Sequence, residues 1–365
     1  MPSLKEIAKL ANTSVTTVSL VINNRDGAAR ISPATRKQVL DAARGLGYTP
    51  NIAARRLRAG GGTPLPLTIG ILLPFDDRLT ITIRAVGTIR QALDDWARAE
   101  RQAAPDLLIE TYDGGHLADV RSLADNTRYN GVILFNTLPA DDDFLALSGP
   151  LPVPVVVVQR TIPDHSWVNV DHFAMGGEVA AHVLGLGRPE IGIVGTDVPG
   201  AAQDTRLAGF LAELRARTGV ELPPHRLARG AFSETGGYEA TRQLLSATRA
   251  AGELPPSTLF VTADRIAIGA LHALKENGMR IPDDVAVVSY DNDPFGAFAD
   301  PPLTTVDASV PLSAARAVRL LLDLIRDGHA GPLTALLEAR LLIRGSCGTN
   351  RRAPAPLPRG TAVPN

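Results

Sequence analysis

The sequence predicts a small all-α head followed by a larger α/β body, whose parallel, doubly wound sheets are divided between two lobes. Apolar residues recur at helical spacing through the first 48 residues. From Leu67 onward, short apolar runs alternate with helical stretches, a pattern typical of parallel sheets. A Gly/Pro-rich stretch separates the two parts. The 365 residues leave room for two or three domains of about 100–200 residues each.

Three short helices are predicted in the head, each preceded by a serine that can cap it. Ser3, Ser14 and Ser32 hold these positions, because a serine hydroxyl accepts a hydrogen bond from a free N–H group of the first helical turn. Glu6 completes a capping box with Ser3, and Pro33 suits a first helical position. The predicted helices span residues 4–11, 15–23 and 33–46.

The body is predicted to alternate strands with helices. The strand candidates are short and almost wholly apolar, and they span residues 68–73, 107–111, 131–135, 153–158, 167–170, 191–195, 258–261 and 285–290. The helical stretches span residues 84–101, 175–186, 206–217, 236–250, 267–277 and 312–326. About 280 residues of this alternation is large for one hydrophobic core, so we expect two lobes.

Composition excludes several classes of protein. No apolar run reaches the length of about 18 residues that a membrane-spanning helix needs. The first residues lack the apolar core of a signal peptide. Cys347 is the single cysteine, which excludes a disulfide scaffold and a cysteine-cluster zinc site. We therefore expect a cytoplasmic protein.

Charge is divided unevenly along the chain. Residues 1–58 carry ten Lys and Arg against three acidic residues, a net charge of +7, so the remainder carries −8 within the total of −1. A basic head on an acidic body indicates that the head meets a polyanion such as nucleic acid. A basic helical face that is merely solvated is the alternative.

Several motifs follow one another along the chain. The head carries LKEIA at 4–8, VTTVS at 15–19, SPATR at 32–36 and GYTPN at 47–51. The body carries DRIAIGA at 264–270, IPDDV at 281–285, SYDN at 289–292 and PLTTV at 302–306. In these motifs the chain resembles the LacI/GalR family of bacterial transcription regulators. The resemblance implies a helix-turn-helix head, a hinge helix and a two-lobed body like that of periplasmic sugar-binding proteins.

The resemblance also implies a domain division, which the Gly/Pro-rich linker supports. It places a helix-turn-helix DNA-binding domain at 1–48, a hinge helix at 49–60, a linker at 61–66 and an effector-binding and dimerisation domain at 67–347. The lobes are expected over residues 67–168 with 308–337 and over residues 169–307 with 338–347. The Pro-rich tail at 348–365 is predicted to be disordered, and it has no leucine heptads for tetramerisation.

The resemblance assigns the second helix to the major groove of DNA. Val15 and Thr16 match the positions that choose bases, Val15 through a thymine methyl group. Leu57 matches a residue that wedges into the minor groove, although packing on the body is its alternative. Helix capping or a solvated face is the alternative for the polar residues. The residues expected to contact DNA are Ser14, Val15, Thr16, Thr17, Ser19, Asn23, Ser32, Thr35, Tyr48, Asn51, Ala54 and Leu57.

The resemblance places a small-molecule effector between the lobes. Arg206 and Asp291 match positions that bind effector hydroxyls, and a mutual salt bridge is their alternative. Phe232 matches an aromatic that stacks on the ligand, with a core position equally open. Gln159 stands where many sugar-responsive members have Asp. The residues expected at the effector are Phe75, Gln159, Arg206, Phe232, Asp264 and Asp291, and Asp76, Asp77 and Arg78 can also face the cleft.

The expected function is therefore that of a homodimeric transcriptional repressor that binds a palindromic operator. A sugar or sugar derivative is the expected effector, and a carbohydrate utilisation operon is the expected target. We expect no catalytic residue, metal or cofactor, because the seven His are dispersed and form no catalytic motif. The alternatives are a plain sugar-binding module and a regulator that answers to a protein partner or a non-sugar metabolite.

Overall fold

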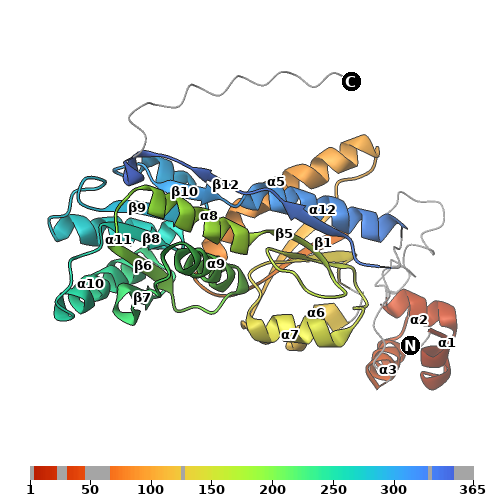
Figure 1. The fold of residues 1–365 in the computed structure, drawn as a ribbon. Coiled ribbons are helices and arrows are strands. Elements are labelled where there is room, and N and C mark those ends of the chain that lie inside the picture. Colours follow the sequence, from red (N-terminus) through yellow and green to blue (C-terminus); the bar gives the residue numbers. More distant parts are fainter. Residues whose placement is uncertain (1–3, 23–30, 46–65, 125–127, 328–330, 349–365) are drawn as a thin grey trace.

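The computed structural model describes residues 4–22, 31–45, 66–124, 128–327 and 331–348 (Figure 1). The head contains α1 (Leu4–Leu10), α2 (Val15–Ile22) and α3 (Pro33–Gly45), which confirms its three predicted helices. The N–H of Thr17 donates to Oγ of Ser14 at 3.0 Å, and the N–H of Thr35 donates to Oγ of Ser32 at 3.1 Å. Both predicted caps are thus present, whereas Ser3 lies outside the described residues.

The head is held together by one small hydrophobic core. Ile7 of α1, Val18 of α2 and Val39 of α3 have no exposed surface, and all three belong to the same cluster. Because each helix contributes one apolar face to this cluster, the remaining faces are left to solvent.

The first lobe contains a six-stranded sheet in which every described strand pair is parallel. Its strand order is β11-β5-β4-β3-β1-β2. The strands are β1 (Thr68–Pro74), β2 (Asp106–Tyr112), β3 (Gly131–Leu134), β4 (Val155–Val158), β5 (Ser166–Val170) and β11 (Thr334–Leu337). Helices α5 (Leu79–Ala99), α6 (Arg121–Ala124), α7 (Pro139–Ser148) and α12 (Val310–Asp327) accompany this sheet.

The second lobe repeats this architecture with the strand order β12-β10-β9-β8-β6-β7. Its strands are β6 (Ile191–Thr196), β7 (Leu227–Gly230), β8 (Thr258–Val261), β9 (Ala286–Tyr290), β10 (Thr304–Asp307) and β12 (Arg340–Leu342). Only β12 is antiparallel to its neighbour among these described strands. Its helices are α8 (His172–Gly185), α9 (Ala201–Thr218), α10 (Glu234–Ala250) and α11 (Asp264–Glu276).

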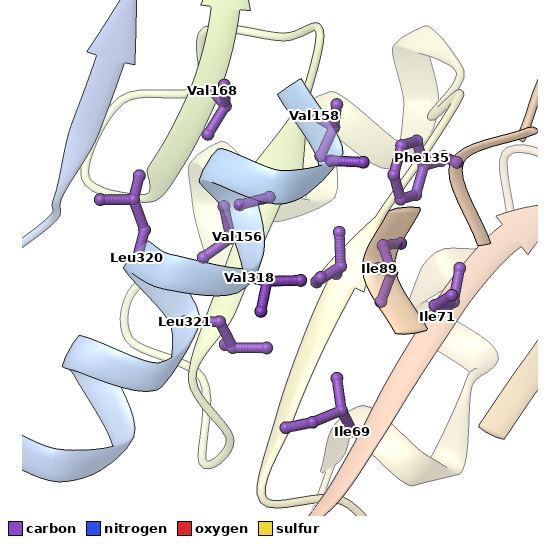
Figure 2. Packing of buried hydrophobic residues seen from close by; sticks show 14 of the residues in the cluster. Ile69, Ile71, Ile89, Phe135, Val156, Val158, Val168, Val318, Leu320 and Leu321 are labelled. Atoms are coloured by element: carbon purple, nitrogen blue, oxygen red, sulfur yellow. The ribbon is translucent and has the colours of Figure 1, made fainter. Parts of the chain in front are cut away.

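Each sheet has a hydrophobic core on both faces, as a doubly wound sheet requires. In the first lobe, α5 and α12 cover one face and Leu145 of α7 belongs to the cluster on the other. Figure 2 shows Val318 and Leu321 of α12 and Val156 of β4 in the same packed group of side chains. Since successive side chains of a strand point to opposite faces, the all-apolar central strands serve both cores.

Besides the short helices α6 and α7, the sequence analysis missed four strands, β7, β10, β11 and β12, and all of them except β10 lie at sheet edges. Strands β7, β11 and β12 have partly exposed residues, and β11 alternates exposed and half-buried positions. They therefore lack the continuous apolar run that marked the central strands. Among the described residues, no helix has the length and apolar character needed to span a membrane. The predicted tail and hinge lie outside the described residues, and the domain limits remain predictions.

Candidate functional site

A small cavity lies between the two lobes. It is reached by the segments that follow β3 and β4 in the first sheet and β6 and β9 in the second, and the carboxyl ends of strands are where parallel α/β sheets bind ligands. Its volume is about 30 Å³, room for very few water molecules, since each needs about 10–15 Å³ of such a cavity. The lining residues are Arg78, Asn136, Gln159, Arg160, Val198, Gly200, Ala202, Gln203, Arg206 and Asp291.

Arg206 and Asp291 meet at this cavity. Nη1 of Arg206 donates to Oδ1 of Asp291 at 3.1 Å and to the carbonyl oxygen of Thr262 at 2.8 Å. The guanidinium also lies over the ring of Tyr290, 3.6 Å from its centroid, a cation–π contact. Burial raises the pKa of the Asp291 carboxyl, and the charge of Arg206 opposes that rise. The salt bridge named as the alternative role of this pair is therefore present, on two residues that also line the cavity.

Helix packing fixes the position of Arg206. Helix α9 lies so close to α8 that a Cβ added to Gly176 would come within 2.0 Å of the carbonyl oxygen of Arg206. A residue larger than glycine would push α9, and with it the arginine, away from the cavity. A glycine on the neighbouring helix therefore determines how close Arg206 lies to the cavity.

Three residues of the cavity wall have left-handed backbone conformations. The φ angles are 54° at Asn136, 58° at Gln159 and 112° at Asp291. Each residue follows the end of a strand, where the chain turns away from the sheet. Non-glycine residues in this region cost on the order of 1–3 kcal/mol and concentrate at functional sites. This backbone strain adds weight to the cavity as the functional site of the body.

Two further arginines reach the cavity from the first lobe. Arg78 makes a paired contact with Asp76, Nη2 to Oδ2 at 2.6 Å and Nε to Oδ1 at 3.1 Å. Arg160 donates to the carbonyl oxygens of Gln159 and Thr137, at 2.8 and 2.7 Å. Both guanidinium groups are buried, which makes the first-lobe side of the cavity strongly polar.

Asp264 is expected at the effector, but it lies fully buried and is not among the residues that line the cavity. Its Oδ2 accepts from the N–H of Asp293 and its Oδ1 accepts from the Thr305 hydroxyl, both at 2.7 Å. Burial, with a smaller contribution from the charge of Asp291, raises its pKa to about 7. In this geometry Asp264 positions the loop after β9, which carries Asp291.

The two expected phenylalanines do not reach the cavity. Phe232 has no exposed surface and packs in the core of the second lobe with Val194 and Val261. This position supports the core alternative and corrects the expected stacking contact. A buried aromatic side chain removes about 150–250 Å² of surface from water, which stabilises the fold. Phe75 is 75% exposed and is not part of the cavity wall.

Direct contacts also join the lobes beside the cavity. Arg84 of α5 forms an ion pair with Asp293, and its Nη2 donates to the carbonyl oxygen of Asn292 at 3.2 Å. From the second lobe, Nη1 of Arg265 donates to the carbonyl oxygen of Asp77 at 3.0 Å. These contacts must break before the lobes can separate.

In the head, the start of α2 presents its side chains to solvent. Val15 is 41% exposed, Thr16 is exposed and Thr17 is half-buried. Ser14 and Thr17 share a hydroxyl hydrogen bond of 2.8 Å, as do Ser32 and Thr35. The other expected DNA contacts cannot be placed: the side chain of Ser19 and residues Asn23, Tyr48, Asn51, Ala54 and Leu57 lie outside the description.

Comparison with known proteins identifies the chain. Residues 3–51 match "Bacterial regulatory proteins, lacI family", and residues 180–347 match "Periplasmic binding protein-like domain". The HTH-type transcriptional repressor PurR of Mannheimia succiniciproducens is 30% identical over 349 residues, 95% of this chain and 98% of the relative. The chain belongs to the lacI family of bacterial regulatory proteins. The resemblance seen in the sequence is thus confirmed.

Other lacI-family proteins align over nearly the whole chain. The HTH-type transcriptional repressor CytR of Escherichia coli is 28% identical, over 94% of this chain and 96% of the relative. The solved structure of a complex of the transcriptional regulator CelR with cellobiose has 26% identity and a TM-score of 0.65, covering 95% of this chain and 100% of that one. The two-lobed fold of this lacI-family chain is therefore that of a transcriptional regulator.

Sequence reasoning missed Asn136, Arg160 and Gln203 of this lacI-family cavity. A signal for Asn136 and Arg160 exists, because each lies just beyond a predicted apolar strand of a parallel sheet. Gln203 lies in the first turn of α9, whose start the sequence analysis placed five residues later. In the described part of the chain, no group of three or more His, Cys, Asp or Glu side chains could hold a metal ion.

Proposed function

We propose that this chain is a homodimeric, DNA-binding transcriptional repressor whose operator affinity is controlled by a sugar-like effector held between its lobes. The observation that carries the proposal is the pairing of two sites in one chain. An exposed first turn of α2 projects from a capped three-helix head, and a buried polar cavity lies between two α/β lobes. Neither a binding module nor an enzyme needs both.

DNA recognition is proposed for the first turn of α2. An α-helix fits the major groove of B-DNA, and its first residues reach the base edges. The methyl groups of Val15 and Thr16 suit contact with a thymine methyl group, and the hydroxyl of Thr16 can add one hydrogen bond. Ser14, Thr17, Ser32 and Thr35 stand at two helix N-termini, where phosphate is favoured. Two heads of a symmetric dimer would read a palindrome.

Effector recognition is proposed for Arg206 and Asp291. A guanidinium and a carboxylate together suit neighbouring hydroxyl groups, at about 1.5–3 kcal/mol for each charge-assisted hydrogen bond. The family relation to CelR, whose solved structure is a complex with cellobiose, favours a sugar. A sugar needs far more room than the very few water molecules that the cavity can hold, so the lobes have to open to admit it.

This opening can couple effector binding to operator binding. Admission of the ligand breaks the contacts of Arg84 and Arg265 across the lobes. The arrangement of the two lobes around a bound ligand therefore differs from their arrangement without one. A coupling free energy of about 1–3 kcal/mol changes operator affinity roughly 5–150-fold. We also propose a cytoplasmic site of action, where the bacterial chromosome lies, and no catalytic activity.

The test is DNA selection with the full chain. A random duplex library should yield a palindrome, and Thr16→Ala should weaken binding to it and relax the preference at one position in each half-site, by about 1 kcal/mol or more per half-site. Gln38→Ala, exposed on α3, is the control within the head. Failure to select any sequence, with sugar binding retained, would identify a plain binding module.

A further inference from the structure

Three guanidinium groups converge on the cavity between the lobes. Arg78 and Arg160 come from the first lobe and Arg206 from the second, and all three line the same space. A methyl group added to Gly200 would lie 3.4 Å from Nη1 of Arg78 and 3.9 Å from Nη2 of Arg160. Gly200 is the N-cap residue of α9, a helix of 18 residues. The start of this helix therefore lies directly against two buried guanidinium groups.

Positive charge dominates the cavity wall. Among the described residues that line the cavity, three are arginines and one, Asp291, is acidic. Asp76 pairs with Arg78, and Asp142 lies 3.4 Å from Nε of Arg160, but neither belongs to the wall. A helix N-terminus adds partial positive charge and free N–H groups from its first turn. The wall thus offers more donors and cations than acceptors and anions.

Part of this donor capacity is unused. Nε of Arg160 and Nε of Arg206 are buried without a hydrogen-bond partner. Arg160 has its two terminal nitrogens on neutral carbonyl oxygens, and among the described residues the one carboxylate in an ion pair with it, that of Asp142, lies 3.4 Å from Nε. Burial lowers the pKa of Arg160; the carboxylate of Asp142 opposes this shift, whereas the charges of Arg78 and Arg206 reinforce it. A buried, mutually repelling set of cations is stabilised by an anion.

We propose that the effector is an anionic sugar derivative, whose phosphate or carboxylate group binds between Arg78, Arg160 and the start of α9 while its hydroxyl groups meet Arg206 and Asp291. The inference rests on the proposed function and specifies its ligand. An arginine fork matches the two oxygens of a carboxylate or a phosphate. A neutral sugar would bring no negative charge to the first-lobe arginines and the start of α9.

The experiment measures the thermal stability of the full-length protein against inorganic phosphate, glucose, glucose 6-phosphate and glucuronate, with ionic strength held constant by sodium chloride. Wild type is compared with Arg78→Gln and Arg160→Gln. Arg90→Gln is the matched control, because Arg90 lies half-exposed on α5 and pairs with Asp94 away from the cavity. Ligands are raised to about 50 mM, so that a weak ligand still gives a saturable shift.

We expect phosphate to raise the melting temperature of wild type and the Arg90→Gln variant in a saturable manner. Arg78→Gln and Arg160→Gln should each weaken this apparent affinity by tenfold or more. If glucose 6-phosphate or glucuronate acts at a lower concentration than phosphate, the ligand is a sugar derivative, as proposed; if phosphate alone acts, the sugar part of the proposal is wrong.

Two outcomes would overturn the anion site. One is a phosphate shift that is absent, or equal in wild type and both cavity variants. The other is a larger shift with glucose than with its anionic counterparts. If Arg160→Gln fails to fold, Arg78→Gln is compared with Arg78→Lys, which keeps the positive charge. Arg78 suits this test because its guanidinium donates to Asp76. Phosphate binding that is lost in Arg78→Gln and kept in Arg78→Lys would support the anion site. Operator binding by wild type, measured separately, shows whether the proposed function stands when the anion site does not.

Discussion

Replacement of Asp264 by Asn should change how stability depends on pH. The folded-state pKa of Asp264 is raised from 3.8 to about 7, first by burial and then by the charge of Asp291. A raised carboxyl pKa means that the folded state binds more protons than the unfolded state between these values. Stability contributed by this group therefore falls as pH rises from about 4 to 7, at about 1.36 kcal/mol per unit.

The magnitude follows from that interval. From pH 5 to pH 8, Asp264 should lower the free energy of unfolding by about 2–3 kcal/mol. Asparagine carries no titrating proton and keeps both contacts, because its oxygen can accept from the N–H of Asp293 and its amide can donate to Thr305. Asp264→Asn should therefore gain about 2–3 kcal/mol relative to wild type between the two pH values.

Urea unfolding followed by circular dichroism at pH 5, 6, 7 and 8 measures this difference. Burial also raises the pKa values of Asp142 and Asp291, so the comparison uses the difference between wild type and variant rather than the wild-type slope. Asp119→Asn, at an exposed position, is the control. Parallel pH profiles for wild type and Asp264→Asn would refute the assignment of a buried, proton-binding Asp264.

Three more predictions follow from the site and its support. Phe232→Ala should lower the free energy of unfolding by about 3–5 kcal/mol in urea, with ligand affinity of the folded protein unchanged; a selective loss of affinity would restore its role as a ligand contact. Ser14→Ala should destabilise the head by about 0.5–2 kcal/mol in thermal melts, and Ser14→Asp should retain the cap; equal stability of the two variants would contradict the capping role. Arg84→Gln removes the ion pair with Asp293 and should increase the radius of gyration that X-ray scattering measures without ligand. An unchanged radius would show that this contact does not hold the lobes together.

Features set by neighbouring residues could be predicted from the sequence. The caps of α2 and α3 depend on residues three positions apart, Ser14 with Thr17 and Ser32 with Thr35. The central strands are apolar on both faces, so a continuous run such as residues 155–158 marks them directly. The pairing of Arg206 with Asp291 required the family resemblance, because 84 residues separate the two positions.

Features set by the meeting of distant segments could not be predicted. Arg160 gains its place because the segment after β4 of one sheet meets the segments after β6 and β9 of the other sheet at the cavity, and sequence spacing does not show this meeting. Phe232 matches a family position for an aromatic that stacks on the ligand, yet the packing of α10 and α11 encloses it. Edge strands such as β11 are short and half-exposed, and only their pairing partners define them.

Effector control of DNA binding is tested by the affinity of the full chain for its selected operator. This affinity is measured by fluorescence anisotropy at fixed salt, with and without a saturating ligand from the thermal-shift panel. We expect a change in operator affinity of roughly 5–150-fold, which is lost in an Arg206→Gln variant that still binds the operator. Equal affinity with and without a ligand that demonstrably occupies the cavity would contradict effector control of DNA binding.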